Sequence, residues 1–595
     1  MQKHASFATL ALTLALALVL TATGLAGADT TDQETALLAT AKSYVDKFFN
    51  DEYDSYAGLM ADELRSAFPA TLAQQVLEQI LALNGPLQTI GESWLEDKIE
   101  VYRRIRVPAV FEKRTIDLRV VFNSDGQVVG FAQAPHVPSP AERNSNEALR
   151  SEPNPEVEGR WAGSVQIPGS ALDVQVDLNY KDGYWVGQID LPTQGAKGVP
   201  LSDIKVTRTE ATFRIVGVPG EPTFHGKLTD GAITGEFTQS GESIPFRLGR
   251  EELARPNRPQ EPQPPFPYEA HDVTFANGEI ELAGTLTVPE GKGPFPATVL
   301  ISGSGSQDRN EEVFDHKPFL VLADYLTRAG IAVLRVDDRG VGKSGGSAAL
   351  ATSDDFAGDT LAGVNYLRSR SEIDQKQIGL IGHSEGGIIA PKLATESKKV
   401  AWVVLLAGPS VPGSELLVRQ VELLARAAGL PYERIDLAVK QQAKLVQLIE
   451  GDAQEGAIRG MLRELLRSQS GGALSEEQLE EQVIAQTANL TSPWFRHFLS
   501  YDPRTALRKL EVPVLALYGE KDLQVDPKQN LPAARKALEQ AGNKDFFVEE
   551  MEGLNHLFQT ATTGSIAEYY TIEETMSPAA LKRIADWIGE RVKKP

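Results

Sequence analysis

The chain has 595 residues, no cysteine and a formal net charge of −22 at pH 7. Its length predicts several domains. The absence of cysteine excludes disulfides, thiol nucleophiles and cysteine-based metal sites. The excess of acidic residues argues against nucleic acid as a partner, and against long-range attraction to anionic substrates or membrane surfaces.

Residues 1–28 predict a Sec-type signal peptide. A positively charged start at Lys3 precedes an apolar stretch, and Ala26-Gly-Ala28 fits a small-residue cleavage site. No cysteine follows, which excludes a cysteine-linked lipid anchor, and no second apolar run approaches membrane-spanning length. We therefore expect a secreted, periplasmic or cell-surface protein without stable membrane insertion after cleavage. An uncleaved N-terminal anchor is the alternative.

Residues 30–135 predict a small α+β domain. Helical segments come first, and strands are expected near 99–107, 115–122 and 128–134. This order resembles cone-shaped domains in which helices cover a curved sheet, an analogy that assigns no binding role. A linker rich in proline and polar residues follows at 136–158, where neither a core nor regular structure is expected.

Residues 159–250 consist of short alternating apolar and polar runs separated by turns. This pattern predicts a small antiparallel β barrel or sandwich. Trp161, Trp185 and Phe213 are expected in its core, with a ligand cleft as the alternative. A second proline-rich linker, again expected to be irregular, covers 251–267.

Strands and helices alternate in residues 268–595, which predicts an α/β domain with a mostly parallel sheet covered by helices. The expected strands lie near 280–288, 297–302, 331–336, 377–382, 400–406, 512–518 and 545–551, and the expected helices near 316–329, 354–370 and 528–541. An insertion at about 411–500 has its own helical periodicity. We expect it to form a cap over the open end of the sheet, with a peripheral helical addition as the alternative.

The segment 377–387 predicts a nucleophile. A short apolar strand enters a Gly-x-Ser-x-Gly turn centred on Ser384, and a helical segment follows. Gly382 and Gly386 leave room for a strained turn that exposes the Ser384 hydroxyl. The N-terminus of the following helix favours negative charge that develops there.

A serine nucleophile needs a base, and the base needs an orienting acid. Asp522, in the loop after the expected strand at 512–518, is the predicted acid, and Glu520 and Asp526 are nearby substitutes. His556, in the loop after the next strand, is the predicted base. Three other histidines are weaker candidates because of their positions: His316, His383 and His497.

An oxyanion hole requires two backbone N–H donors beside the nucleophile. One is predicted to be the N–H of Glu385. The loop that begins after 297–302 is rich in small residues, and we assign the second donor to Ser304, with Gly305 as the alternative. A phosphate-binding loop is a competing interpretation, but the loop contains neither of the common glycine-rich phosphate motifs.

With these motifs in place, residues 268–595 resemble an α/β-hydrolase of the esterase and serine-aminopeptidase-like branch. The order Ser384, Asp522, His556 is typical of that fold. The segment from Asp338 to Ser344 is similar to the family's Asp-Arg-Gly-x-Gly-x-Ser segment. The loop after 297–302 resembles the oxyanion loop but lacks the His-Gly start of other branches.

The resemblance implies a two-step mechanism without a metal or organic cofactor. Ser384 is acylated, the leaving group takes a proton from His556, and water hydrolyses the acyl-enzyme. The leading hypothesis is a secreted serine carboxylesterase acting on small-molecule esters with small or medium acyl groups. Substrate choice depends on the pocket that the cap shapes, and the sequence indicates no oligomeric state.

Two other functions are considered. A serine aminopeptidase or amidase would use the same triad on short peptides, and Glu477, Glu480 and Glu481 of the cap are candidates to bind the substrate amine. A non-catalytic scaffold with a relic hydrolase domain is the remaining hypothesis. The intact triad argues against it, because loss of activity usually needs only one absent group.

Overall fold

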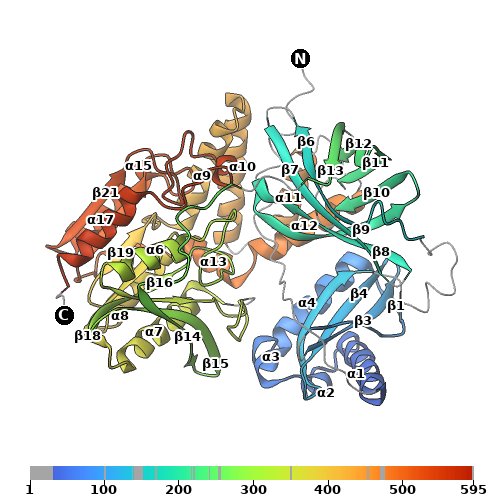
Figure 1. Ribbon diagram of the computed structural model, residues 1–595, viewed down its shortest axis with the longest axis horizontal. Helices are drawn as coiled ribbons and strands as arrows, with labels where there is room; N and C mark the ends of the chain where they lie inside the picture. Colours follow the sequence, from blue (N-terminus) through green and yellow to red (C-terminus); the bar gives the residue numbers. More distant parts are fainter. Residues whose placement is uncertain are drawn as a thin grey trace.

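The computed structural model contains three separate sheets, each with its own hydrophobic core (Figure 1). The structure describes residues 31–99, 102–136, 139, 152–167, 170–181, 183–215, 218, 222–239, 242–251, 256–348, 351–451, 454–469 and 476–592. The predicted signal peptide and most of the predicted first linker lie outside these residues. Within them, no helix has the length and apolar character needed to cross a membrane.

The first sheet is antiparallel and combines with four helices. Its strands are β1 (Leu87–Ile90), β2 (Trp94–Ile99), β3 (Tyr102–Phe111), β4 (Thr115–Phe122) and β5 (Val128–Pro135), in the order β1-β3-β4-β5 with β2 also paired to β3. The helices are α1 (Thr31–Phe49), α2 (Tyr53–Ala57), α3 (Asp62–Ala67) and α4 (Ala70–Asn84). α1 packs against β1, β3 and β4, and its buried Tyr44 and Phe48 join the core.

The second sheet is a closed antiparallel barrel in the order β10-β11-β12-β13-β6-β7-β8-β9. Its elements are β6 (Gly159–Ile167), β7 (Ser170–Lys181), β8 (Tyr184–Leu191), the 3₁₀ turn η3 (Pro192–Gln194), β9 (Ala196–Val206), β10 (Glu210–Ile215), β11 (Thr223–Thr229), β12 (Ala232–Gln239) and β13 (Glu242–Gly249). Trp161, Trp185 and Phe213 are buried in its core, so the cleft alternative is wrong for these side chains.

The end of the first predicted linker belongs to the barrel. Val157 is fully buried in the barrel core, and its carbonyl accepts the Trp161 indole N–H at 2.7 Å. A buried indole needs such an acceptor, which explains the contact. The expectation that this linker packs no core is therefore wrong at Val157.

The third sheet has eight described strands in the order β14-β15-β17-β16-β18-β19-β20-β21. They are β14 (Tyr268–Asn277), β15 (Ile280–Pro289), β16 (Phe295–Ile301), β17 (Ala332–Val336), β18 (Ile373–His383), β19 (Val403–Leu406), β20 (Val514–Gly519) and β21 (Phe546–Met551). β14 and β15 pair antiparallel, and neighbouring strands from β17 to β21 pair parallel. Every residue of β16 and β20 is buried, as is typical of strands covered on both faces.

Along the chain, helices alternate with the strands of this sheet. They are α6 (Pro318–Arg328), α7 (Ser353–Ser369), α8 (Gly386–Glu396), α14 (Arg504–Leu507), α15 (Pro527–Gln540), α16 (Ile566–Tyr569) and α17 (Pro578–Gly589). α7 begins with a capping box between Thr352 and Asp355, and Asp526 caps α15. These caps satisfy N–H groups that the first helical turn leaves without partners.

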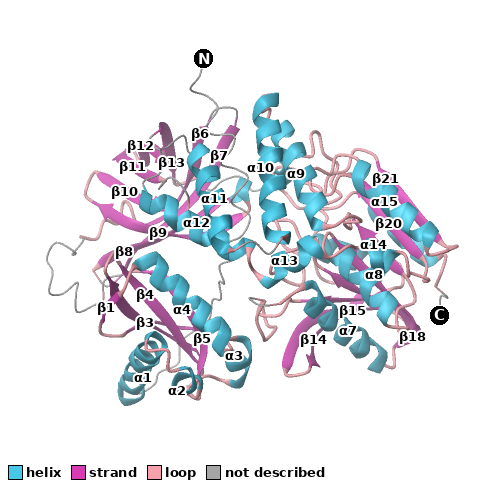
Figure 2. Ribbon diagram, turned by 180° about the vertical axis from the view of Figure 1, so that it is seen from behind, coloured by secondary structure: helices cyan, strands magenta, loops and turns pink. Residues whose placement is uncertain are grey.

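The predicted insertion at about 411–500, which lies between β19 and β20, contains five described helices: α9 (Gly413–Ala427), α10 (Tyr432–Glu450), α11 (Glu455–Gln469), α12 (Glu476–Leu490) and α13 (Pro493–Ser500). They share a small apolar core of their own. The helices lie between the third sheet and the two N-terminal sheets, and α12 contacts α4 (Figures 1 and 2). The insertion is thus packed on both sides.

The second predicted linker has no helix or strand in its described residues 256–267, as expected, but it is tied to the region of the third sheet. Arg258 donates hydrogen bonds of 2.7 to 3.2 Å to four backbone carbonyls from two loops: Phe314, Asp315, Tyr570 and Ile572. Lys197 of the barrel adds a contact, because its Nζ lies 2.8 Å from Glu312 and 2.5 Å from Asp315. The planar guanidinium supplies the donors that the proline-rich backbone lacks.

We predict that Arg258→Met lowers the free energy of unfolding by about 2 kcal/mol, because carbonyls that now accept from a charged donor lose it. Urea denaturation measures this. Arg214→Met is the control, since Arg214 pairs with Asp203 on the barrel surface and such exposed pairs contribute about 1 kcal/mol or less. Equal losses in the two variants would contradict the role given to Arg258.

Candidate active site

Ser384 occupies a strained turn between β18 and α8. Its φ of 50° lies in the left-handed region, which costs a side-chain-bearing residue about 1–3 kcal/mol. The Ser384 N–H donates to the Leu406 carbonyl at 2.8 Å, which ties the turn to β19. A Cβ at Gly382 would lie 2.0 Å from the Gly386 carbonyl oxygen, and one at Gly386 would lie 2.2 Å from that of Ile301. Only glycine fits at these two positions.

Asp522 and His556 meet in the two loops that follow β20 and β21. His556 Nδ1 lies 2.8 Å from Asp522 Oδ2, and both side chains are buried. The other carboxylate oxygen of Asp522 accepts the N–H groups of Gln524 and Val525, each at 2.8 Å. These bonds fix the carboxylate so that it can orient the imidazole.

The substitute acids have other partners. Glu520 accepts the Gly553 N–H at 2.8 Å, and Asp526 accepts the Lys528 N–H at 3.0 Å while pairing with Arg419 of α9 at 2.7 Å. In the described part of the chain, Asp522 is thus the acid among the three that contacts His556.

The other histidines serve different contacts. His316 is buried between loops, 2.9 Å from the Tyr569 carbonyl oxygen, and burial lowers its pKa to about 4. His497 lies 3.4 Å from Asp354. His383 Nε2 lies 3.0 Å from the His556 carbonyl oxygen, so the turn at Ser384 and the His556 loop are in direct contact. Within the described residues, no hydrogen bond joins the Ser384 hydroxyl to His556. In free enzymes such a catalytic hydrogen bond is often long and shortens only when substrate binds.

The predicted oxyanion donors are available. Among the described residues, the N–H groups of Glu385 and Ser304 donate no hydrogen bond, and the same holds for Gly305, the alternative. The loop lies against the nucleophile, because a Cβ at Gly303 would be 3.2 Å from Ser384 Cβ. The Gly303 N–H is occupied, since it donates to Glu311 Oε1 at 2.7 Å. The geometry leaves both Ser304 and Gly305 open as the second donor.

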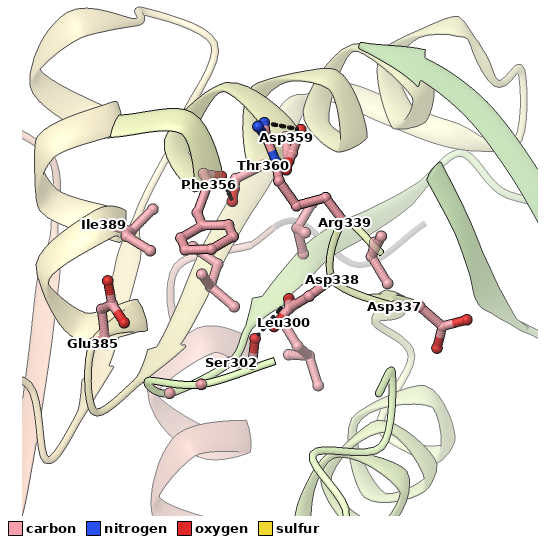
Figure 3. A pocket seen from close by; sticks show the side chains of 15 residues that line it. Leu300, Ser302, Asp337, Asp338, Arg339, Phe356, Asp359, Thr360, Glu385 and Ile389 are labelled. Carbon is pink, nitrogen blue, oxygen red and sulfur yellow. Dashed lines mark hydrogen bonds and ion pairs between the residues drawn. The ribbon is translucent and has the colours of Figure 1, made fainter. Parts of the chain in front are cut away.

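A small open pocket adjoins this loop (Figure 3). Phe356 and Ile389 form apolar parts of its wall, and Ser302, Asp338 and Glu385 form polar parts. Figure 3 places Ile389 and Glu385 along α8 and Asp338 beside Ser302.

Two carboxyl groups in this wall, the half-buried Asp338 and the buried Glu385, make contacts that the sequence motifs did not indicate. Asp338 accepts the Ser302 hydroxyl at 3.0 Å and the Gln307 N–H at 2.9 Å, and burial raises its pKa to about 8. Glu385 accepts the Ser353 hydroxyl at 2.5 Å and the Trp494 indole N–H at 2.8 Å, and burial raises its pKa as well.

Both contacts were beyond prediction because the partners are far apart in sequence. Trp494 belongs to α13. Its hydrogen bond to Glu385 therefore joins the insertion directly to the residue that follows Ser384. Asp338 braces the predicted oxyanion loop at both Ser302 and Gln307. No group of three or more histidine, aspartate and glutamate side chains arranged to hold a metal ion occurs among the described residues.

We predict that Gly386→Ala destabilises the protein by about 3 kcal/mol, because the new methyl group overlaps the Ile301 carbonyl and forces a backbone shift. Gly460→Ala is the matched control. Gly460 is exposed in α11 with nothing near its Cβ position, so alanine stabilises by about 1 kcal/mol through helix propensity. Urea denaturation compares them, and a neutral Gly386→Ala would refute the steric account.

We predict that Asp338→Asn removes a pH dependence of stability. The folded-state pKa of about 8 lies above the usual aspartate value of 3.8, so the neutral carboxyl stabilises the fold at low pH, and this contribution is lost as the pH rises to about 8. Asparagine mimics the neutral form, since its amide donates to Ser302 and its oxygen accepts from Gln307. The Tm of the variant minus that of the wild type should therefore grow between about pH 4 and pH 8 and then level off. A constant difference would contradict this.

Comparison with known proteins supports the assignment of this region. The model of the serine aminopeptidase family S33 matches residues 317–560. Esterase EstD from Thermotoga maritima is 27% identical over 324 residues, which cover 54% of this chain and 68% of that protein. The putative hydrolase YtaP from Bacillus subtilis is 33% identical over 115 residues, 17% of this chain and 38% of that protein.

Solved structures give a weaker likeness. The Pyrococcus furiosus esterase Pf2001 aligns with a TM-score of 0.33 and 15% identity, covering 57% of this chain and 99% of that chain. The hypothetical protein PA2218 from Pseudomonas aeruginosa aligns with a TM-score of 0.35 and 18% identity, covering 55% and 94%. The family model and the sequence relatives agree with the motifs around Ser384. The C-terminal half of this chain is an α/β-hydrolase domain of the esterase and serine-aminopeptidase-like branch.

Proposed function

We propose that this protein is a secreted serine hydrolase that cleaves small or medium acyl esters through Ser384, His556 and Asp522. The observation that carries the proposal is the buried contact of 2.8 Å between His556 Nδ1 and Asp522 Oδ2, beside a left-handed turn that bears Ser384. The match to a hydrolase family and the similarity to an esterase from Thermotoga maritima support it.

The dyad determines which nitrogen acts as the base. Asp522 only accepts hydrogen bonds when ionised, so His556 Nδ1 carries the proton and Nε2 keeps a lone pair for the Ser384 hydroxyl. As Ser384 attacks the ester carbonyl, His556 takes its proton and becomes an imidazolium that Asp522 stabilises. His556 then gives that proton to the departing alcohol. Water, activated by the same nitrogen, hydrolyses the acyl-enzyme.

The charge on the tetrahedral intermediate is met by backbone donors. The N–H group of Glu385, the residue after Ser384, and that of Ser304, in the loop after β16, donate no hydrogen bond within the described residues. The N-terminus of α8 adds a favourable dipole. These donors are already fixed in place. Asp338 braces the loop that contains Ser304, and the side-chain hydrogen bonds of Glu385 hold the turn after Ser384. Preorganised donors stabilise the transition state without reorganisation.

The pocket favours an uncharged acyl group of modest size. Phe356 and Ile389 provide apolar contacts, and burial raises the pKa of Glu385, which favours its neutral form. The Trp494–Glu385 hydrogen bond brings the insertion to this wall, so we propose that α13 limits acyl length. Export rests on the signal sequence in residues 1–28.

A serine aminopeptidase or amidase is the second candidate, and the description of the matching family model favours it. Such an enzyme needs an acid near the substrate amine. Of the three insertion residues considered, Glu480 already pairs with Arg463, while the side chains of Glu477 and Glu481 lie outside the described residues. The ester reaction needs no such acid and less help for the leaving group.

The test is a panel of p-nitrophenyl esters of increasing acyl length beside aminoacyl p-nitroanilides. We predict turnover of short esters and a loss of about 10⁴-fold or more in kcat/KM for Ser384→Ala. Asp522→Asn should lose about 10⁴-fold, because the amide N–H faces His556 Nδ1 and favours the wrong tautomer.

Melting temperatures of these variants provide the control for folding. Turnover of the anilides alone would replace the esterase proposal with the peptidase. Ester hydrolysis that survives Ser384→Ala would exclude Ser384 as the nucleophile.

A further inference from the structure

A second buried histidine lies directly beside the proposed nucleophile. His383 Nδ1 is 2.8 Å from Glu311 Oε1, and its Nε2 is 3.0 Å from the His556 carbonyl oxygen. Both side chains are less than one-tenth exposed. The mechanism above uses neither His383 nor Glu311, and the sequence offers His383 only as a weaker candidate for the base.

The contacts define the protonation of His383. A carbonyl oxygen only accepts, so Nε2 carries a proton, and the Glu311 carboxylate requires a proton on Nδ1 as well. Burial opposes the charged ring, but the Glu311 carboxylate, the His556 carbonyl and the Asp522 charge outweigh it, and the pKa of His383 is raised. His383 is therefore an imidazolium paired with Glu311, and its ring centroid lies 4.9 Å from that of His556.

Glu311 connects this pair to the oxyanion loop. The same Oε1 that contacts His383 accepts the Gly303 N–H at 2.7 Å, and Gly303 immediately precedes Ser304. Glu311 itself has a φ of 53°, an unfavourable backbone conformation for a glutamate that the surrounding contacts maintain. One carboxylate oxygen thus holds both the oxyanion loop and, through His383, the backbone of the base.

We propose that Glu311 and His383 are positioning residues that hold the oxyanion loop and the His556 loop in register around Ser384. This inference rests on the proposed function. It requires that the pair affects kcat more than KM, because the pair holds groups that act in the transition state.

Three variants separate the two contacts. His383→Asn keeps an amide donor near the position of Nδ1, towards Glu311, and loses the bond to the His556 carbonyl. His383→Gln reaches the position of Nε2 and loses the bond to Glu311. Glu311→Gln keeps the size of the side chain and removes its charge. His271→Gln is the control, because His271 is exposed on β14 and contacts Glu269.

Activity is measured per active site, by titration with a fluorophosphonate that labels the nucleophilic serine, on the ester that the wild type hydrolyses best. We expect kcat to fall by up to about 10²-fold with KM nearly unchanged, the loss expected from a misplacement of about 1 Å. The double variant Glu311→Gln/His383→Gln should lose little more than the more damaging single variant.

The outcomes distinguish this inference from the function beneath it. If the wild type neither hydrolyses esters nor reacts with the fluorophosphonate, the proposed function fails and the inference falls with it. If the wild type is active and the variants lose only melting temperature, with kcat and KM per labelled site unchanged, the pair has a packing role and the inference is wrong. Fully additive losses would also overturn a pair that acts as a unit.

Discussion

The left-handed backbone at Ser384 is the constraint on which the active-site region depends. A residue with a side chain adopts φ of 50° only where its neighbours enforce it, and here the turn is enclosed by backbone from three strands. Gly382 and Gly386 permit that approach, and the Leu406 carbonyl fixes the Ser384 N–H. Because the turn is rigid, every other group of the proposed site can be placed relative to it.

The segment that carries Glu311 links this turn to the N-terminal units. On its inner side, Glu311 bonds to Gly303 and His383. On its outer side, Lys197 of the barrel contacts Glu312 and Asp315, and Arg258 binds the carbonyls of the same segment. The barrel therefore contacts the segment that supports the predicted oxyanion loop. This arrangement gives the N-terminal units a physical connection to the site without requiring them to bind a ligand.

Sequence patterns predicted the family, which the comparisons confirm, and most elements of its sheet. β14 was missed because it is an edge strand whose residues are largely exposed and lack a buried apolar run. Alternation predicted an antiparallel barrel or sandwich but could not distinguish the two, because closure depends on the last strand of the unit, β13, pairing with the first, β6. The motifs predicted Ser384, Asp522 and His556 as the catalytic residues; the structure brings Asp522 and His556 into contact, and their catalytic roles stay a prediction. They could not give Glu311 or Trp494, whose partners lie 72 and 109 residues away in sequence and meet only in the folded chain.

The central claim is that Ser384 is the nucleophile of an acyl-transfer site. The most direct measurement is peptide mass spectrometry of the protein after reaction with a fluorophosphonate, which forms a stable bond to an activated serine. The account predicts a stoichiometric adduct on the peptide that contains Ser384, and no adduct after His556→Ala. An adduct on another serine, or labelling of Ser384 that is independent of His556, would contradict it.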